Sequence, residues 1–129
     1  MVTPGEGFAR ALAAGDAAAL AAVLSETVDF AALTPGRHWA AGTASEVART
    51  IVLGHWFGRA ERIELLALTT AAAGGREHVA YRLGVRRDGQ DFLVEQQAYY
   101  DSQDGRITWL RVLCSGYQPV SPGSAPISP

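Results

Sequence analysis

The spacing of hydrophobic residues along the chain changes near residue 60, from a helical period to a strand period. Before that point apolar residues recur every three or four positions. A Thr-x-x-Glu capping box starts at residues 3 and 43, and an aspartate at residue 16 precedes an alanine-rich run. We therefore expect three helices, over residues 3–15, 16–24 and 43–58. In the third, Val47, Ile51 and His55 fall on one stripe, which should face the core.

After residue 60 apolar and polar residues alternate, as in strands that bury one face. The strand-like segments cover residues 62–71, 77–86, 91–101 and 106–114. Between them stand Gly74-Gly75, Asp88-Gly89 and Asp104-Gly105, which are typical of hairpin turns. Successive hairpins predict an antiparallel meander, and a short strand at 27–30 should join its edge, followed by a loop over 34–42.

These elements predict an α+β fold, a cone-shaped curved antiparallel sheet wrapped around three N-terminal helices with a central pocket. Strands of about ten residues must twist and bend, and helices then close the curved sheet. We expect one domain over residues 1–119. The tail at 120–129 is rich in serine and proline and should be disordered.

Composition excludes several kinds of partner. The formal net charge is −2 and basic residues are not clustered, so we expect no nucleic-acid partner. No apolar run has the length of a bilayer span, and no signal peptide is evident, so we expect no membrane partner. A single cysteine, Cys114, fits a reducing cytoplasm. No metal-ligand spacing or glycine-rich phosphate loop occurs, so we expect neither metal nor cofactor.

Three short motifs resemble the nuclear transport factor 2-like superfamily, which includes ketosteroid isomerases and SnoaL-like polyketide cyclases. They are Ala14-Gly15-Asp16 between the first two helices, Leu24 to Phe30 entering the first strand, and Asp104-Gly105-Arg106-Ile107 before the last strand. The resemblance covers residues 5–119. It supports the predicted fold and says little about chemistry.

The resemblance also implies which side chains face the pocket. On the last strand these are Thr108, Leu110, Val112 and Cys114; on the strand before it Leu93, Glu95, Gln97 and Tyr99; and on the next Val79, Tyr81, Leu83 and Val85. His55 is then placed on the pocket side of the third helix.

The catalytic groups of the isomerases are missing. The positions of their tyrosine and two aspartates correspond here to Phe8, Phe30 and Gln97, so the resemblance excludes a steroid isomerase. The Asp-Arg-Asp set of an epoxide hydrolase of this fold is not found. His38 and His55 are two candidates for the paired histidines of scytalone dehydratase, another enzyme of this superfamily.

Glu95 is the main catalytic candidate. A carboxylate on a central strand that points into an apolar cavity is desolvated, which raises its pKa toward the range of a proton shuttle. Alternatively, Glu95 pairs with an arginine and is structural. His55 could act with it, since imidazole titrates near neutral pH, or could simply lie near the carbonyls at a helix end.

Other polar and aromatic residues could complete the site. Tyr81 and Tyr99 could donate hydrogen bonds to a developing oxyanion, or be core residues with satisfied hydroxyls. The expected ligand-binding residues are Gln97, His38, Trp39, Trp56, Leu110 and Cys114.

The opposite face of the last two strands should be strongly apolar. It would carry Phe92, Val94, Ala98, Tyr100, Ile107, Trp109 and Leu113. Such a surface is too large for a small domain to leave in water, and proteins of this superfamily often dimerise through the convex sheet face. We therefore expect a homodimer; the alternative is that the tail or a helix covers this face.

Two functions remain open at this point. The first is a cofactor-free acid/base enzyme, a cyclase, isomerase or dehydratase acting on a small hydrophobic carbonyl compound. The second is a non-catalytic module of the same fold that binds a small molecule or only dimerises.

Overall fold

Side-chain caps begin the first two helices where the sequence predicts them. In the computed structural model, which describes residues 2–120, Thr3 Oγ1 accepts a hydrogen bond from the Glu6 backbone N–H (3.1 Å) and begins α1 (Pro4–Ala13). Asp16 Oδ1 accepts one from the Ala19 N–H (3.0 Å) and begins α2 (Ala17–Ala22). The second helix is shorter than expected, because Leu24 already opens the first strand.

The third helix, η1 (Glu46–Trp56), has a wider turn than an α-helix. Its hydrogen bonds are of the π type, five residues apart, and the Phe57 N–H continues the pattern by donating to the Val52 carbonyl (2.9 Å). Thr43 Oγ1 accepts from the Glu46 N–H (3.1 Å), as the predicted capping box requires.

The wider turn changes which side chains of η1 reach the core. Val47 and Ile51 are buried, as predicted, but Trp56 is buried in the place expected for His55, which is exposed. A stripe drawn at α-helical spacing drifts around a π-helix because each turn holds more residues. The prediction that His55 faces the interior is therefore wrong.

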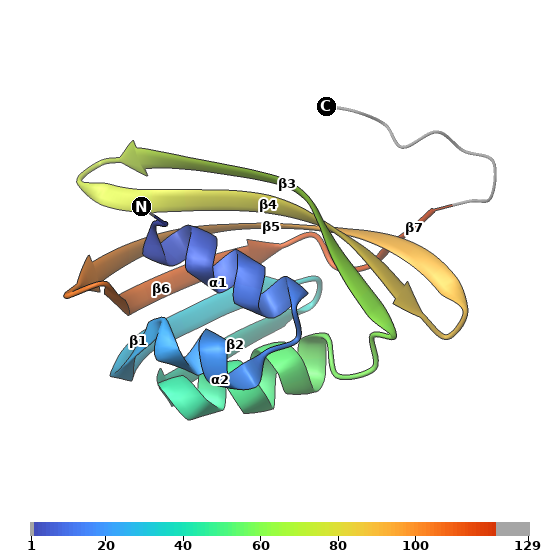
Figure 1. The fold of residues 1–129 in the computed structure, drawn as a ribbon, viewed down its shortest axis with the longest axis horizontal. Helices are drawn as coiled ribbons and strands as arrows, with labels where there is room; N and C mark the ends of the chain where they lie inside the picture. The colour runs from blue at the N-terminus through green and yellow to red at the C-terminus, as the bar shows by residue number, and fades with distance from the viewer. Residues whose placement is uncertain (1, 121–129) are drawn as a thin grey trace.

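Within residues 2–120, seven strands form one curved sheet (Figure 1). They are β1 (Leu24–Thr34), β2 (Arg37–Thr43), β3 (Arg62–Ala73), β4 (Arg76–Arg87), β5 (Gln90–Gln103), β6 (Arg106–Cys114) and β7 (Gln118–Pro119). The order is β2-β1-β6-β5-β4-β3, with β7 paired to β5. Neighbours are antiparallel except β1 and β6, which run parallel.

The segment expected to be a loop at 34–42 instead contains most of β2. Pro35 and Gly36 make a two-residue turn in which Gly36 has a φ of 75°, so Thr34 pairs directly with Arg37. A positive φ at this position is easy for glycine. The first strand pairs with β6, the last strand of the meander, as predicted, and β2 lies beyond it at the edge of the sheet.

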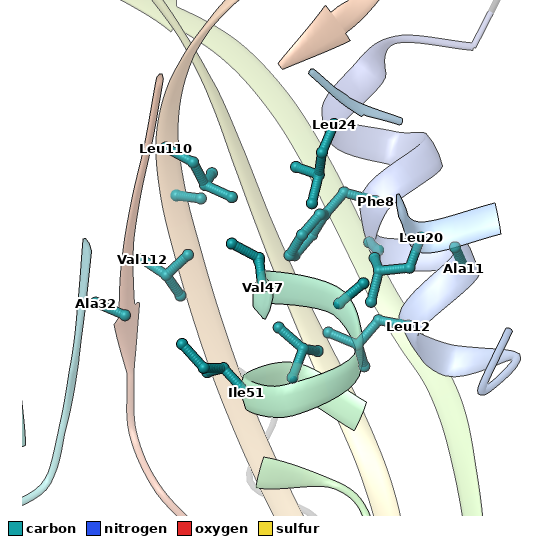
Figure 2. Packing of buried hydrophobic residues seen from close by; sticks show 14 of the residues in the cluster. Phe8, Ala11, Leu12, Leu20, Leu24, Ala32, Val47, Ile51, Leu110 and Val112 are labelled. Atoms are coloured by element: carbon teal, nitrogen blue, oxygen red, sulfur yellow. The ribbon is translucent and has the colours of Figure 1, made fainter. Parts of the chain in front are cut away.

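The three helices of the described part of the chain pack on one face of the sheet, and apolar side chains fill the space between helices and sheet (Figure 2). Phe8 and Leu12 of α1, Val47 of η1 and Leu110 of β6 all point into this space, and each of them is at most 1% exposed. The predicted central pocket is thus occupied by the protein's own core.

The direction of the side chains on β5 is opposite to the prediction. The Asp88-Gly89 turn has only two residues, both with positive φ, so Arg87 pairs with Gln90 and Tyr81 with Gln96. Odd-numbered residues of β4 therefore share a face with even-numbered residues of β5. As Tyr81 faces the core, so does Gln96.

We call the face of the sheet that the helices do not cover the outer face. Because the side chains of β5 point the opposite way, this face carries other residues than predicted. Val94, Ala98, Tyr100 and Ile107 are buried in the core, and Phe92 is half-buried against Tyr117 at the end of the sheet. Of the residues expected outside, Trp109 and Leu113 remain there. On β5, Gln97 pairs with Leu113 and Asp101 with Trp109, and Glu95 and Tyr99 lie on the same face.

The predicted disordered tail lies outside the described residues except for Val120. The Val120 N–H donates to the Asp91 carbonyl (3.0 Å). Among residues 2–120, none of the helices is both long and apolar enough to span a bilayer.

Candidate ligand pocket

An open pocket of about 400 Å³ lies at one end of the cone, where β4 and β6 end and β5 begins. We call it the mouth pocket. Its apolar lining comes from Pro35, Trp56, Phe57, Val94 and Tyr117, and its polar lining from Thr34, His55, Arg87, Cys114, Ser115, Gly116 and Gln118. The wide final turn of η1 brings Trp56 into this lining.

Trp56 has a buried hydrogen-bond donor, its indole Nε1–H. Its side chain contacts Phe30 and Trp39 at ring-centroid distances of 6.2 Å and 6.0 Å. Within residues 2–120, nothing accepts a hydrogen bond from its buried Nε1. Trp39 differs, because its Nε1 donates to Thr34 Oγ1 (2.8 Å). A buried indole N–H normally finds a partner, so the Trp56 donor indicates a place for an external acceptor.

Arg87 supplies a second such donor. Its guanidinium carbon lies 4.0 Å from the Tyr117 ring centroid and 5.3 Å from that of Phe92. Its Nε is buried and no acceptor for it exists in the part of the chain described here. Burial raises the pKa of Tyr117, and the charge of Arg87 partly offsets this rise. The Tyr117 hydroxyl donates to the Trp56 carbonyl and holds the two linings together.

Deeper on the same face of β5, Gln96 and Tyr81 form a buried pair. The Tyr81 hydroxyl donates to Gln96 Oε1 at 2.6 Å, and Gln96 is only 3% exposed. The amide nitrogen of Gln96 then has no acceptor among the described residues. Burial, and secondarily the nearby Cys114, raise the pKa of Tyr81 well above its usual value, so this hydroxyl stays protonated and donates.

Two further groups of the mouth pocket can take part in chemistry. The His55 ring is exposed and packs on Trp39, with 5.3 Å between ring centroids. Cys114 is half-buried, and its sulfur accepts from the Gly116 N–H (3.4 Å). Both residues were predicted to belong to the site, and both line the mouth pocket.

Glu95 does not face this pocket. Its side chain is 56% exposed on the outer face and pairs with Arg82, with 3.3 Å between Nη2 and Oε2. The orientation that we predicted is wrong because the even-numbered residues of β5, not the odd-numbered ones, face the core. The desolvation on which its proposed acid/base role depended is absent, and the alternative of an arginine partner matches the structure.

For the same reason, the other two candidates of this strand point outward. Gln97 and Tyr99 are exposed on the outer face, where Gln97 Oε1 lies 3.1 Å from His78 Nε2. His38, on β2, is exposed on this face too, beside Leu33. These three residues cannot reach the mouth pocket from their positions.

The remaining predicted residues lie inside. Leu110 is part of the packed core, and Trp39 is half-buried between β2 and η1. Sequence reasoning missed Gln96 and Arg87. The two-residue turn at 88–89 was the signal for both. It pairs Arg87 with Gln90, and this pairing fixes from the sequence alone which residues of β4 and β5 face inward.

Comparison with known proteins yields solved structures only: no family model matches the chain, and no curated protein matches it. A candidate polyketide cyclase of Xanthomonas campestris is 20% identical with a TM-score of 0.65, over 85% of this chain and 86% of that one. An LEH-like epoxide hydrolase of Mycobacterium tuberculosis is 20% identical with a TM-score of 0.64, over 87% and 80%.

A third similar structure comes from Catenulispora acidiphila and is described as having a ketosteroid isomerase-like fold in complex with trimethylamine. It is 15% identical with a TM-score of 0.63, over 84% of this chain and 82% of that one. The predicted α+β cone is therefore confirmed as the nuclear transport factor 2-like fold, which SnoaL-like proteins share. At these identities the similarity establishes the fold, and the function must be argued from the pocket.

Proposed function

We propose that this protein binds a small, largely apolar organic molecule with oxygen acceptors in the mouth pocket. The observation that carries the proposal is that two residues of the lining, Trp56 and Arg87, each have a buried N–H donor (Nε1 and Nε) with no acceptor among residues 2–120. Each such donor costs about 1–3 kcal/mol when unpaired, and a ligand oxygen would offset that cost. A volume of about 400 Å³ lies within the range of small-molecule sites.

The indole N–H of Trp56 allows a direct test. In ¹⁵N-labelled protein the three tryptophans give separate indole resonances, which Trp→Phe variants assign. We expect titration with 2-naphthoate or its neutral methyl ester to shift the Trp56 indole resonance. Trp56→Phe should weaken binding, whereas Trp109→Phe, which removes an outer-face indole, should not. If neither probe moves the Trp56 signal at millimolar concentration, the binding proposal fails.

A second candidate function is cofactor-free acid/base catalysis on a carbonyl compound, with His55 as the base. His55 lines the same pocket as the unpaired donors, and similar structures include candidate cyclases and isomerases. In this hypothesis His55 removes a proton from carbon while Trp56 Nε1 donates to the developing oxyanion. Glu95 has no part in it.

Elimination of 5-nitrobenzisoxazole tests the base without knowledge of the natural substrate. A base removes the C3 proton, the N–O bond breaks, and the released phenolate absorbs visible light. We expect a measurable rate that falls by about 10²-fold in His55→Gln. His78→Gln, on the outer face, is the matched control. An unchanged rate in His55→Gln would exclude His55 as the base.

We further propose that the outer face forms a homodimer. Leu33, Leu66, Tyr99 and Leu113 are each between 42% and 52% exposed there, and Leu33 and Leu113 are adjacent on paired strands. A hollow of about 580 Å³ lies over β1, β6 and β5. The face also carries both members of the Arg82–Glu95 and Arg111–Asp29 ion pairs, so a second copy meets charges of both signs.

Sedimentation equilibrium tests the dimer. Leu113→Asp should convert a micromolar dimer into a monomer, whereas Ala18→Asp on the exposed side of α2 should leave it intact. A wild-type chain that sediments as a monomer at 100 µM would refute the proposal.

The free thiol supports a proposed location in the reducing cytoplasm. Cys114 is half-buried in the lining of the mouth pocket, where oxidation would add polar bulk. Fractionation of the native cells would test this location, and recovery from an oxidising compartment would refute it.

A further inference from the structure

We infer that the ligand of the mouth pocket carries a carboxylate, and that Arg87 is the residue that selects it. This inference rests on the proposed binding function and adds the charge and the orientation of the ligand. It comes from a comparison of the arginines of the chain, which supply all eleven of its basic side chains.

Arg87 is the exception among the half-buried arginines. Three arginines are half-buried, and two of them have a carboxylate partner: Arg82 pairs with Glu95 (3.3 Å) and Arg111 with Asp29 (3.0 Å). Arg87 has none within residues 2–120. The other arginines without an ion pair are exposed to water, which solvates their charge.

The two carboxylates nearest to Arg87 in sequence form ion pairs with other arginines. Asp88 pairs with Arg59 at 2.9 Å, and Asp91 pairs with Arg86 at 3.1 Å. The hairpin therefore directs its own acidic groups away from Arg87. A charge that is partly removed from water and left without a counter-ion is unfavourable, so an external anion gains more here than at an exposed arginine.

The surroundings of Arg87 favour a planar carboxylate over a neutral acceptor. Tyr117 and Phe92 lie under the guanidinium, which orients its plane and limits its rotamers. A guanidinium held in this way can bind the two oxygens of a carboxylate through parallel hydrogen bonds. A ligand with its carboxylate at Arg87 would extend its apolar part over Val94 and Trp56, which line the same pocket.

Acid and ester forms of one probe separate this inference from the binding proposal. We would measure Kd for 2-naphthoate and for methyl 2-naphthoate from the indole resonances, at pH 7.5 and in low salt. We expect the acid to bind at least tenfold more tightly than the ester. In Arg87→Met this preference should disappear. Binding of the ester that persists, even if weaker than in the wild type, shows that the pocket remains folded.

Two further variants complete the design. Arg86→Met removes the neighbouring arginine, which pairs with Asp91, and should keep the preference for the acid. Arg87→Lys keeps the positive charge but loses the planar guanidinium that can donate two parallel hydrogen bonds. It should therefore retain only part of the preference for the acid. Equal affinity of acid and ester for the wild-type protein would overturn the inference and leave the binding proposal standing. So would a preference that survives in Arg87→Met. If neither compound binds, the binding proposal itself has failed.

Discussion

The buried pair of Tyr81 and Gln96 gives the sharpest test of the interior described above. Tyr81→Phe removes a hydroxyl from a fully buried position and leaves Gln96 Oε1 without its donor. Gln96→Leu removes the acceptor of that hydroxyl, but it also removes an amide nitrogen that has no acceptor among the described residues. The two single changes therefore differ in what they leave behind.

The expected magnitudes follow from these unpaired groups. A buried polar group that loses its partner costs about 1–3 kcal/mol, so Tyr81→Phe should destabilise the fold by about 2 kcal/mol. Gln96→Leu should cost less, about 0–1 kcal/mol, because removal of the unpaired nitrogen offsets part of the loss. The double variant leaves neither partner unsatisfied and should lie within about 1 kcal/mol of the wild type.

Urea unfolding with a common m-value gives the free energy of unfolding of the wild type, the two single variants and the double variant. With a slope of about 1–3 kcal/mol per molar, a loss of 2 kcal/mol moves the midpoint by roughly 1 M. We expect the double variant to be more stable than Tyr81→Phe alone. If the effects of the two single changes simply add, the hydroxyl and the amide do not interact in the folded protein, and our description of the interior is refuted.

Three further predictions concern the rest of the fold. Glu95→Gln should change the free energy of unfolding by less than about 1 kcal/mol and leave probe binding unchanged, because its ion pair is exposed; a loss of binding in the titration would reopen its role. Gly5→Ala should lower stability by about 1–3 kcal/mol in urea, since the new Cβ would lie 2.7 Å from Tyr100 Cε1; an unaffected midpoint would show that this contact relaxes freely. Burial raises the pKa of Tyr81 and of Tyr100 above the unfolded value of 10.0, so the stability they contribute is complete below that pH and declines as the pH rises above it. Urea midpoints at pH 9 and 11 should show this decline, and it should be smaller in Tyr81→Phe; an equal decline in both proteins would contradict the assignment.

Much of the candidate site followed from local sequence signals, and its main error came from the family resemblance. Inward positions on β4 and β6 were correctly assigned, so Tyr81, Leu110 and Cys114 lie where the alternation places them. On β5 the alternation was recognised but its phase was taken from the isomerase resemblance. This choice predicted Glu95 on the inward face, where the structure has Gln96. Alternation has a period of two, so an error of one residue reverses every side chain of the strand.

By itself the sequence determined the number and type of most elements, the caps of the helices, the hairpin positions and hence the α+β cone, because these depend on spacing and turn chemistry within a few residues. Only the tertiary structure decided that the middle of the cone is packed and that the pocket lies at its mouth. It also decided that η1 turns wide enough to bury Trp56 rather than His55. These features depend on how side chains from distant segments fill a shared volume, and on which buried donors remain without partners once that volume is filled. Neither is encoded in local periodicity.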